Sequence, residues 1–418
     1  MSIALYPKML RGTINVPSSK THTFINILLS TLCTSATKIL NPDYSEEIIT
    51  LINALKQLNV KFKITDEYLI VSPIKETVSD NKTIECKNYD SILMSLLLLS
   101  SSITKFISFH GDSCIFELFD KQTIDNLPIT YLKTNNTLNI TNINNINELN
   151  LINIPSPYLI IGSILYGLYT KQDITLHINQ KLINSPHLKM LQSVLLNYQV
   201  SLEISKESNV IYLTYQQPIS PDQISIEGDW IQGAHYITMG LSNERLIINN
   251  LNLASHQPEA MIIDYLKNKN ALISIGNNIL TTENSFLKAY DFDLLLCPIL
   301  STLIICLSSI SEGTSTLHNY DKLSEKYQSI ILKLISILNS FGSKIIISEN
   351  KLIIEGVKSL EGGLINEQID SLITLSLLSI SNYFIKPLEF IDFNNLNKTF
   401  PYFLEALKQI DVQIFERI

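Results

Sequence analysis

Cysteine is the residue type in this chain most suited to metal binding or to disulfide formation, and its spacing argues against both. The five cysteines occur singly, with no CxxC pair and no cluster of histidines beside them. They are Cys33, Cys86, Cys114, Cys297 and Cys306. We therefore expect no metal site, no cofactor and no disulfide, and interpret the five as buried thiols in a reducing compartment.

Charged residues are scarce, and their balance bears on the possible partners. They make up 17% of the 418 residues and leave a formal net charge of −8. Arginine occurs only at Arg11, Arg245 and Arg417. Because no lysine-rich face offsets the negative charge, the phosphate backbone of nucleic acid would be repelled. We expect no nucleic-acid partner.

The N-terminal segment and the longest uncharged run bear on location. The first residues lack a basic segment followed by a long apolar run, so we expect a cytoplasmic protein. The uncharged run 294–311 is nearly long enough to cross a bilayer. However, Pro298 and several hydroxyl side chains interrupt it, and similar runs recur elsewhere in the chain. We interpret it as a buried helix and expect no membrane association.

The chain repeats one pattern of elements six times, in units of roughly 70 residues. Each unit has an apolar helix, a short β-branched strand, an amphipathic helix and another strand, as in 27–64 and 159–204. Such units predict α/β (α+β) modules with helices packed inward and sheets outside. The first helix of each unit is nearly uncharged, which predicts burial on all sides. The Asn-rich segment 134–153 alternates Ile or Leu with polar residues and predicts a surface hairpin.

Four segments, in order along the chain, resemble the 5-enolpyruvylshikimate-3-phosphate (EPSP) synthases. They are GTINVPSSKTHTF from Gly12, IEGDWIQGAHY from Ile226, ASHQPEAMIIDYL from Ala254 and NKTFPYFLEAL from Asn397. The resemblance implies a two-lobed enolpyruvyl transferase fold, an inside-out α/β barrel of six βαβαββ units with three in each lobe. It implies lobes of residues 1–18 plus 228–418 and 19–227, with a hinge near Ser18 and Glu227.

The resemblance also implies a reaction. The family transfers the enolpyruvyl group of phosphoenolpyruvate to shikimate 3-phosphate, in the shikimate pathway of aromatic amino acid biosynthesis. Two phosphates and two carboxylates must then share one closed cleft, which requires arginines that bind them bidentately and stay charged. The chemistry also needs a proton donor and a proton acceptor.

Five residues keep a family type or position. They are Lys20, Thr21, Ser156, Lys326 and Lys398, which we expect to bind substrate, with Lys20 and Lys326 as the catalytic candidates if the protein is active. At the start of a helix, Lys20 and Thr21 could still bind phosphate. The alternative is that these lysines are ordinary solvated side chains.

Most of the other family positions carry a different residue type. Apolar residues stand where the family has arginines, at Ile25, Met94, Leu118, Ile330 and Ile369. A glycine-rich anion-binding loop falls on Lys87 to Met94, where only Asn88 is kept and Asp90 would repel an anion. The family's Arg-Pro pair falls on Leu118 and Phe119, its Ser-Ser-Gln triplet on 155–157, and its proton-exchanging aspartate on Ile299.

Two groups of residues could replace the lost acid-base groups. His22, His187 and His235 fall near the family segments, although a histidine beside apolar sequence is usually structural. Asp291 and Asp293 precede Pro298 and would serve only if the loop were shifted in register. Neither group is favoured over a structural interpretation.

Two functions stay open from the sequence. The first is a degenerate EPSP synthase-like protein, a pseudoenzyme that is inactive or strongly impaired and keeps a binding or assembly role. Its partners would be weakly bound shikimate 3-phosphate or phosphoenolpyruvate, or another protein. The second is an active enolpyruvyl transferase, with the usual or an altered substrate, that uses the remaining lysines. The joint loss of arginines and acid-base groups favours the first.

Overall fold

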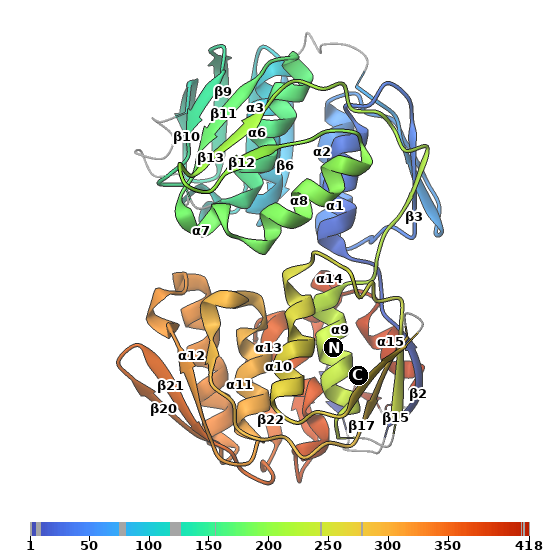
Figure 1. Ribbon diagram of the computed structural model, residues 1–418, viewed down its shortest axis with the longest axis vertical. Coiled ribbons are helices and arrows are strands. Elements are labelled where there is room, and N and C mark those ends of the chain that lie inside the picture. The colour runs from blue at the N-terminus through green and yellow to red at the C-terminus, as the bar shows by residue number, and fades with distance from the viewer. Residues whose placement is uncertain are drawn as a thin grey trace. The chain divides into compact units, whose positions relative to one another are not determined.

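The structure is a computed structural model that describes residues 2–5, 10–74, 81–117, 127–154, 156–242, 245–276, 279–410, 412 and 414–417. The chain forms two compact units (Figure 1). Unit 1 comprises Met1–Pro17 and Glu227–Ile418, and unit 2 comprises Ser18–Ile226. The chain passes from one unit to the other near Ser18 and Glu227, and the use of these two segments as a hinge stays a prediction.

Unit 2 contains three successive α/β modules. The first has α1 (Lys20–Ser30), β3 (Thr37–Leu40), α2 (Glu46–Gln57), β4 (Phe62–Ile64) and β5 (Tyr68–Val71). The second has β6 (Lys82–Lys87), α3 (Asp90–Ile103), β7 (Ile107–Gly111), α4 (Ser113–Glu117), β8 (Ile129–Lys133) and β9 (Thr137–Ile143). The third has β10 (Glu148–Asn150), α6 (Pro157–Thr170), β11 (Ile174–His177), α7 (Gln180–Ile183), α8 (Pro186–Asn197), β12 (Glu203–Ser205) and β13 (Val210–Leu213), and β14 (Gln223–Ser225) completes the first sheet.

Unit 1 repeats the same order of elements, with two N-terminal strands, β1 (Ser2–Leu5) and β2 (Arg11–Asn15). Its first module has α9 (Trp230–Gly240), β15 (Arg245–Asn249), the 3-10 helix η1 (Pro258–Met261), α10 (Ile262–Asn268), β16 (Ile273–Gly276) and β17 (Ile279–Glu283). The second has β18 (Phe292–Asp293), η2 (Leu294–Leu296), η3 (Pro298–Leu300), α11 (Ser301–Ser309), β19 (Thr314–His318), η4 (Tyr320–Lys322), α12 (Glu325–Ser340), β20 (Lys344–Ser348) and β21 (Lys351–Glu355). The third has β22 (Gly363–Ile365), α13 (Ser371–Ser379), η5 (Ser381–Tyr383), β23 (Leu388–Phe390), α14 (Asn394–Thr399), α15 (Phe403–Lys408) and β24 (Ile414–Arg417).

The six four-stranded sheets share one topology, which confirms the six-fold repeat. Their strand orders are β14-β3-β5-β4, β6-β7-β9-β8, β10-β11-β13-β12, β2-β15-β17-β16, β18-β19-β21-β20 and β22-β23-β1-β24. In each sheet the first pair is parallel and the next two pairs are antiparallel. This is the predicted inside-out arrangement of βαβαββ modules.

The apolar first helices fill the interior of each unit, as their lack of charge predicts. Every residue of α9, α11 and α13 is buried, and so is nearly all of α3. Close packing of α6 on α3 depends on Gly162, where a Cβ atom would lie 2.6 Å from the carbonyl oxygen of Met94. The second helices α2 and α12 instead keep an exposed polar face.

The segments around Gly228 and Gln257 bind each other within unit 1. The Gln257 side chain accepts a hydrogen bond from the backbone N–H of Trp230 (3.1 Å) and donates to Glu227 Oε1 (2.8 Å). Asp229 caps α9 by accepting from the N–H of Gln232 (2.8 Å). A Cβ at Gly228 would lie 2.1 Å from the Asn250 carbonyl oxygen, so only glycine fits there. These two motif segments therefore fix the start of α9.

Two predictions from the sequence hold only in part. In the segment 134–153, β9 forms a hairpin with β8, but β10 pairs with β11 in the next sheet, so the segment is divided between two sheets. The buried residues Leu138, Ile140 and Leu149 explain this division, because they complete the hydrophobic core beneath two different sheets. Cys114 is exposed on α4, whereas the other four cysteines are buried thiols.

The run 294–311 is not one long helix. It forms η2, then η3 followed directly by α11, and the non-helical backbone of Cys297 (φ −153°, ψ 81°) separates η2 from η3. Within the described residues, none of the helices combines the length and the apolar character needed to cross a bilayer.

His235 lies fully buried in α9 and should make unit 1 sensitive to acid. Its Nδ1 donates to the carbonyl of Ile231 (2.7 Å), and burial lowers its pKa from 6.5 to about 4. Since the unfolded chain binds a proton more readily, the free energy of unfolding should fall by about 3 kcal/mol between pH 6.5 and pH 4. In urea titrations at pH 7 and pH 4.5, His235→Gln should lose this part of the pH dependence. The exposed control His256→Gln should keep it, and equal dependence in both variants would contradict the assignment.

Candidate functional site

Lys20 begins α1, the helix that starts unit 2 after the chain leaves unit 1. Ser19 caps this helix because its Oγ accepts from the N–H of His22 (3.3 Å), while its carbonyl accepts from Thr23. The Lys20 side chain is about a quarter exposed. The side chain thus stands at the positive end of a helix, where an anion could bind.

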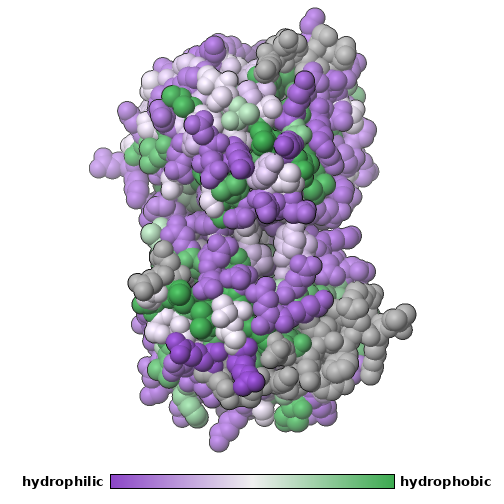
Figure 2. Space-filling view, turned by 90° about the vertical axis from the view of Figure 1, so that its right-hand side faces the viewer, coloured by the Kyte–Doolittle hydropathy of each residue, from purple (hydrophilic) through white to green (hydrophobic). Residues whose placement is uncertain are grey.

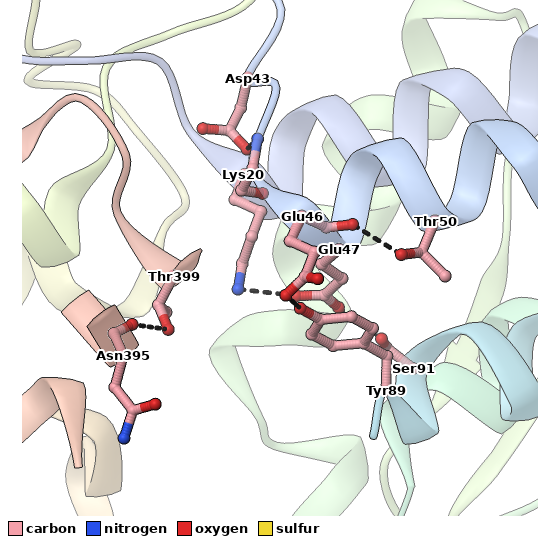
Figure 3. A network of polar contacts seen from close by, with 10 residues as sticks. Lys20, Asp43, Glu46, Glu47, Thr50, Tyr89, Ser91, Asn395 and Thr399 are labelled. Atoms are coloured by element: carbon pink, nitrogen blue, oxygen red, sulfur yellow. Dashed lines mark hydrogen bonds and ion pairs between the residues drawn. The ribbon is translucent and has the colours of Figure 1, made fainter. Parts of the chain in front are cut away.

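Carboxylates occupy the position that an anion would take beside Lys20. Lys20 Nζ lies 2.7 Å from Glu47 Oε2, and the other oxygen of Glu47 accepts from Ser91 (Figure 3). Glu46, the preceding residue on α2, accepts from Lys87 Nζ (2.7 Å) and from Tyr89 (3.1 Å). The Glu47 carboxylate is 11% exposed, so this ion pair is largely shielded from water. A phosphate or carboxylate ligand at Lys20 would therefore lie beside the Glu47 carboxylate, which would repel it.

A third acid, Asp43, lies close enough to Lys20 to be affected by its charge. Asp43 is buried, and burial raises the pKa of its carboxyl, while hydrogen bonds from Ser45 and the charge of Lys20 lower it. Its backbone N–H donates to Thr23 on α1 (3.0 Å), which ties the loop before α2 to the helix that carries Lys20. The surroundings of Lys20 therefore carry more acidic groups than basic ones.

The loop between β6 and α3 is where the sequence predicts the family's glycine-rich segment. Lys87 has a left-handed backbone (φ 52°), and its amine is turned to Glu46. Asp90 begins α3, in the first turn where an anionic ligand would approach the backbone N–H groups. Asn88 is exposed. This loop therefore lies against the carboxylates of α2 and is followed directly by the acidic Asp90.

The remaining predicted residues are divided between the two units. In unit 2, Ser156 caps α6 by accepting from the N–H of Leu159 (3.4 Å), and Thr21 is half-buried in the first turn of α1. In unit 1, Lys326 is exposed in the first turn of α12, and Lys398 is exposed near the end of α14. Ser156 thus has a structural role as a cap, whereas both unit 1 lysines reach solvent.

The apolar residues that the sequence predicts at the family's arginine positions lie in the hydrophobic cores. Ile25 and Met94 are each 2% exposed in the core of unit 2, and Ile330 and Ile369 are 9% and 5% exposed in that of unit 1. These side chains are packed against other apolar groups, so they offer an anion neither charge nor a hydrogen bond. Leu118, Phe119 and Pro155 lie outside the described residues.

The residues predicted at acid-base positions of unit 1 also lie in structural surroundings. Ile299, where the sequence predicts the family's aspartate position, is half-buried in η3 and packs against the core. Glu367 forms an ion pair with Lys333 on α12, both partly exposed. The side chain of Gln328, two residues after Lys326, donates to the carbonyls of Asp321 and Leu323 (3.0 and 2.8 Å). Glu367 and Gln328 therefore already have partners inside unit 1.

The proposed replacement groups also have structural roles. His235 is in the core, Asp293 caps η2 by accepting from Leu295 (3.0 Å), and Asp291 accepts from the N–H of Thr316 (2.7 Å). His22 lies in the first turn of α1 and His187 is exposed on α8. In the described part of the chain, no three histidine, cysteine or acidic side chains are grouped so that they could hold a metal ion.

The sequence did not reveal Glu46, Glu47 and Asp43 as neighbours of Lys20. The run DYSEE is typical of a helix start with acidic residues in its first turn. The contact of this acidic run with Lys20 depends on the packing of α2 beside α1, which cannot be predicted from the spacing of residues in the sequence. The signal was the acidic run itself, following a segment suited to anion binding.

Comparisons with known proteins agree with this architecture. The sequence profile of the EPSP synthase (3-phosphoshikimate 1-carboxyvinyltransferase) family matches residues 6–407. The 3-phosphoshikimate 1-carboxyvinyltransferases of Clostridium botulinum strain Eklund 17B and Clostridium novyi are 27% and 26% identical, over 97% and 98% of this chain and 96% and 97% of theirs. The EPSP synthase structure from Acinetobacter baumannii matches the fold with a TM-score of 0.78 and 15% identity, over 99% of this chain and all of that one. This chain therefore belongs to the EPSP synthase family.

Proposed function

We propose that this protein keeps the scaffold of an EPSP synthase but is inactive or strongly impaired in enolpyruvyl transfer, and that it has a binding or assembly role. The observation that carries the proposal is the ion pair between Lys20 and Glu47, with Glu46 and Asp43 beside it. An acidic site repels phosphoenolpyruvate and shikimate 3-phosphate, both of which are anions.

The buried apolar residues support the same proposal. Arginine binds a phosphate or carboxylate with two parallel hydrogen bonds, and isoleucine or methionine supplies none. Transfer between two anionic substrates requires that they be held together in a reactive pose. With Ile25, Met94, Ile330 and Ile369 in the cores, the groups that would hold them are replaced by packing.

The remaining features of Lys20 favour a second candidate, a transferase with an altered substrate. Lys20 and Thr21 still stand at the N-terminus of α1, and the Lys20 side chain is partly open to solvent. A ligand with fewer negative charges than the family's substrates would meet less repulsion from Glu46 and Glu47. Activity that depends on Lys20 would distinguish this candidate from the first.

Calorimetric titration tests the proposal. Shikimate 3-phosphate and phosphoenolpyruvate, added separately and together, should each bind with a Kd weaker than roughly 1 mM, less than about 4 kcal/mol of binding free energy. Glu47→Gln should tighten binding because it removes one competing charge from Lys20, whereas Glu67→Gln, at an exposed acid away from this network, should not. Micromolar binding of shikimate 3-phosphate to the unmodified protein would contradict the proposal.

A further inference from the structure

Lys269 has an unusual environment, deep within unit 1. It follows α10 and is 0% exposed, although it stands in the polar sequence KNKN that is typical of a solvated turn. Its backbone is fixed at both ends, because its N–H donates to the carbonyl of Leu266 (3.0 Å) and its carbonyl accepts from Lys288 (3.0 Å). The burial of this side chain is therefore built into the turn between α10 and β16.

The amine of Lys269 is held against an aromatic ring. Nζ lies 5.3 Å from the centroid of the Tyr265 ring, and among the described residues no hydrogen-bond partner meets it. Tyr265 is itself buried, packed edge-on against Phe292 (5.0 Å) and Tyr290 (5.9 Å), and its hydroxyl lies 3.3 Å from Ser308. A ring face attracts a cation, but it does not replace the hydrogen bonds that an ammonium group makes with water.

The groups that face Lys269 decide its charge. Burial lowers its pKa from 10.5 to about 7, and the nearby carboxylate of Asp291 partly offsets this. Tyr265 stays neutral because burial raises the pKa of its hydroxyl. From the segment before β18 come Tyr290 and Asp291, both exposed, and Asp291 is held in place by its bond from Thr316. The amine thus has a buried position beside Tyr265 and an exposed carboxylate within reach of its charge.

We propose that Lys269 is a proton-operated switch in unit 1. Its uncharged amine is held in the core against Tyr265, and protonation drives the side chain outward toward Asp291 and water. A flexible four-carbon chain permits this movement without unfolding α10. Its departure removes the amine from the Tyr265 ring and releases the turn between α10 and β16 from residues 285–291. The turn is joined to these residues through Lys288 and through Ser285 (2.9 Å to the N–H of Leu272). This proposal does not depend on whether the protein transfers enolpyruvyl groups.

Hydrogen exchange followed by mass spectrometry tests the switch in the full-length protein. Exchange rates of peptides covering 262–276 are divided by the intrinsic chemical rates at each pH. If one proton is taken up when this segment opens, the equilibrium constant for opening should increase about tenfold for each pH unit from pH 10 down to pH 7. Below pH 7 it should stay constant. Peptides from α6 in unit 2 should show no such trend.

Three variants separate the switch from a merely structural lysine. Lys269→Met should remove the trend, and the matched control Lys288→Met, at an exposed lysine in the adjoining segment, should keep it. Asp291→Asn should move the levelling-off to lower pH, because it removes the charge that favours the protonated amine. The same trend in the unmodified protein and in Lys269→Met would overturn the proposal. If Lys269→Met failed to fold, the proposal would be overturned by an Asp291→Asn protein in which the trend becomes constant at the same pH as in the unmodified protein.

Discussion

Replacing Ile25 with arginine should destabilise unit 2 by about 4 kcal/mol, because a guanidinium group would be buried without a partner. Ile25 is 2% exposed and packs in the hydrophobic core of that unit. A restored arginine would therefore lie in a packed apolar region instead of facing a ligand. Urea unfolding followed by circular dichroism measures the loss, and hydrogen exchange of peptides from α1 assigns it to unit 2.

The matched control for this substitution is Ile49→Arg. Ile49 lies on the neighbouring helix α2 and is 38% exposed, so arginine there should change the free energy of unfolding by less than about 0.5 kcal/mol. A fully stable Ile25→Arg protein that also gains affinity for phosphate would show that position 25 opens on an anion site. That result would remove one main support of the proposed loss of activity.

Enolpyruvyl transfer should be at least 10⁴-fold slower than in an active family member, because two effects act together. Loss of positioned acid-base groups typically costs about 10²–10⁴-fold, and each missing charge-assisted contact to phosphate adds to it. Restoring the acid alone, in Ile299→Asp, should therefore give no measurable rescue, since the substrates would still not be held together. The C. botulinum relative, assayed in parallel, gives the reference rate. Recovery of turnover in Ile299→Asp would show that the binding groups are intact.

The fold could be predicted from the sequence because its signals are local and repeated. The uncharged helices and β-branched strands recur at a constant spacing, and the structure arranges them as six sheets of identical topology. The segment 134–153 shows the limit of such signals. Its alternation predicted strands correctly, but β9 and β10 find their partners through contacts with β7 and β11, which lie before and after the segment.

The candidate site could be predicted only in part. Isoleucine at positions 25 and 369, where the resemblance implies arginine, predicted a site with less positive charge. The burial of both side chains explains why apolar residues are stable there. The partner of Lys20 could not be predicted, because Glu47 is brought to it by helix packing. Lys269 was also missed, since a lysine between two asparagines normally indicates a solvated turn.

Phosphate release from phosphoenolpyruvate in the presence of shikimate 3-phosphate tests the central claim most directly. The unmodified protein is compared with Lys20→Ala and with Lys56→Ala, which removes an exposed lysine from α2. We predict no release above background in any of the three, because Lys20 is engaged by Glu47 and the residues predicted at the arginine positions are apolar. Turnover in the unmodified protein that persists in Lys56→Ala and disappears in Lys20→Ala would contradict the account and establish an active transferase.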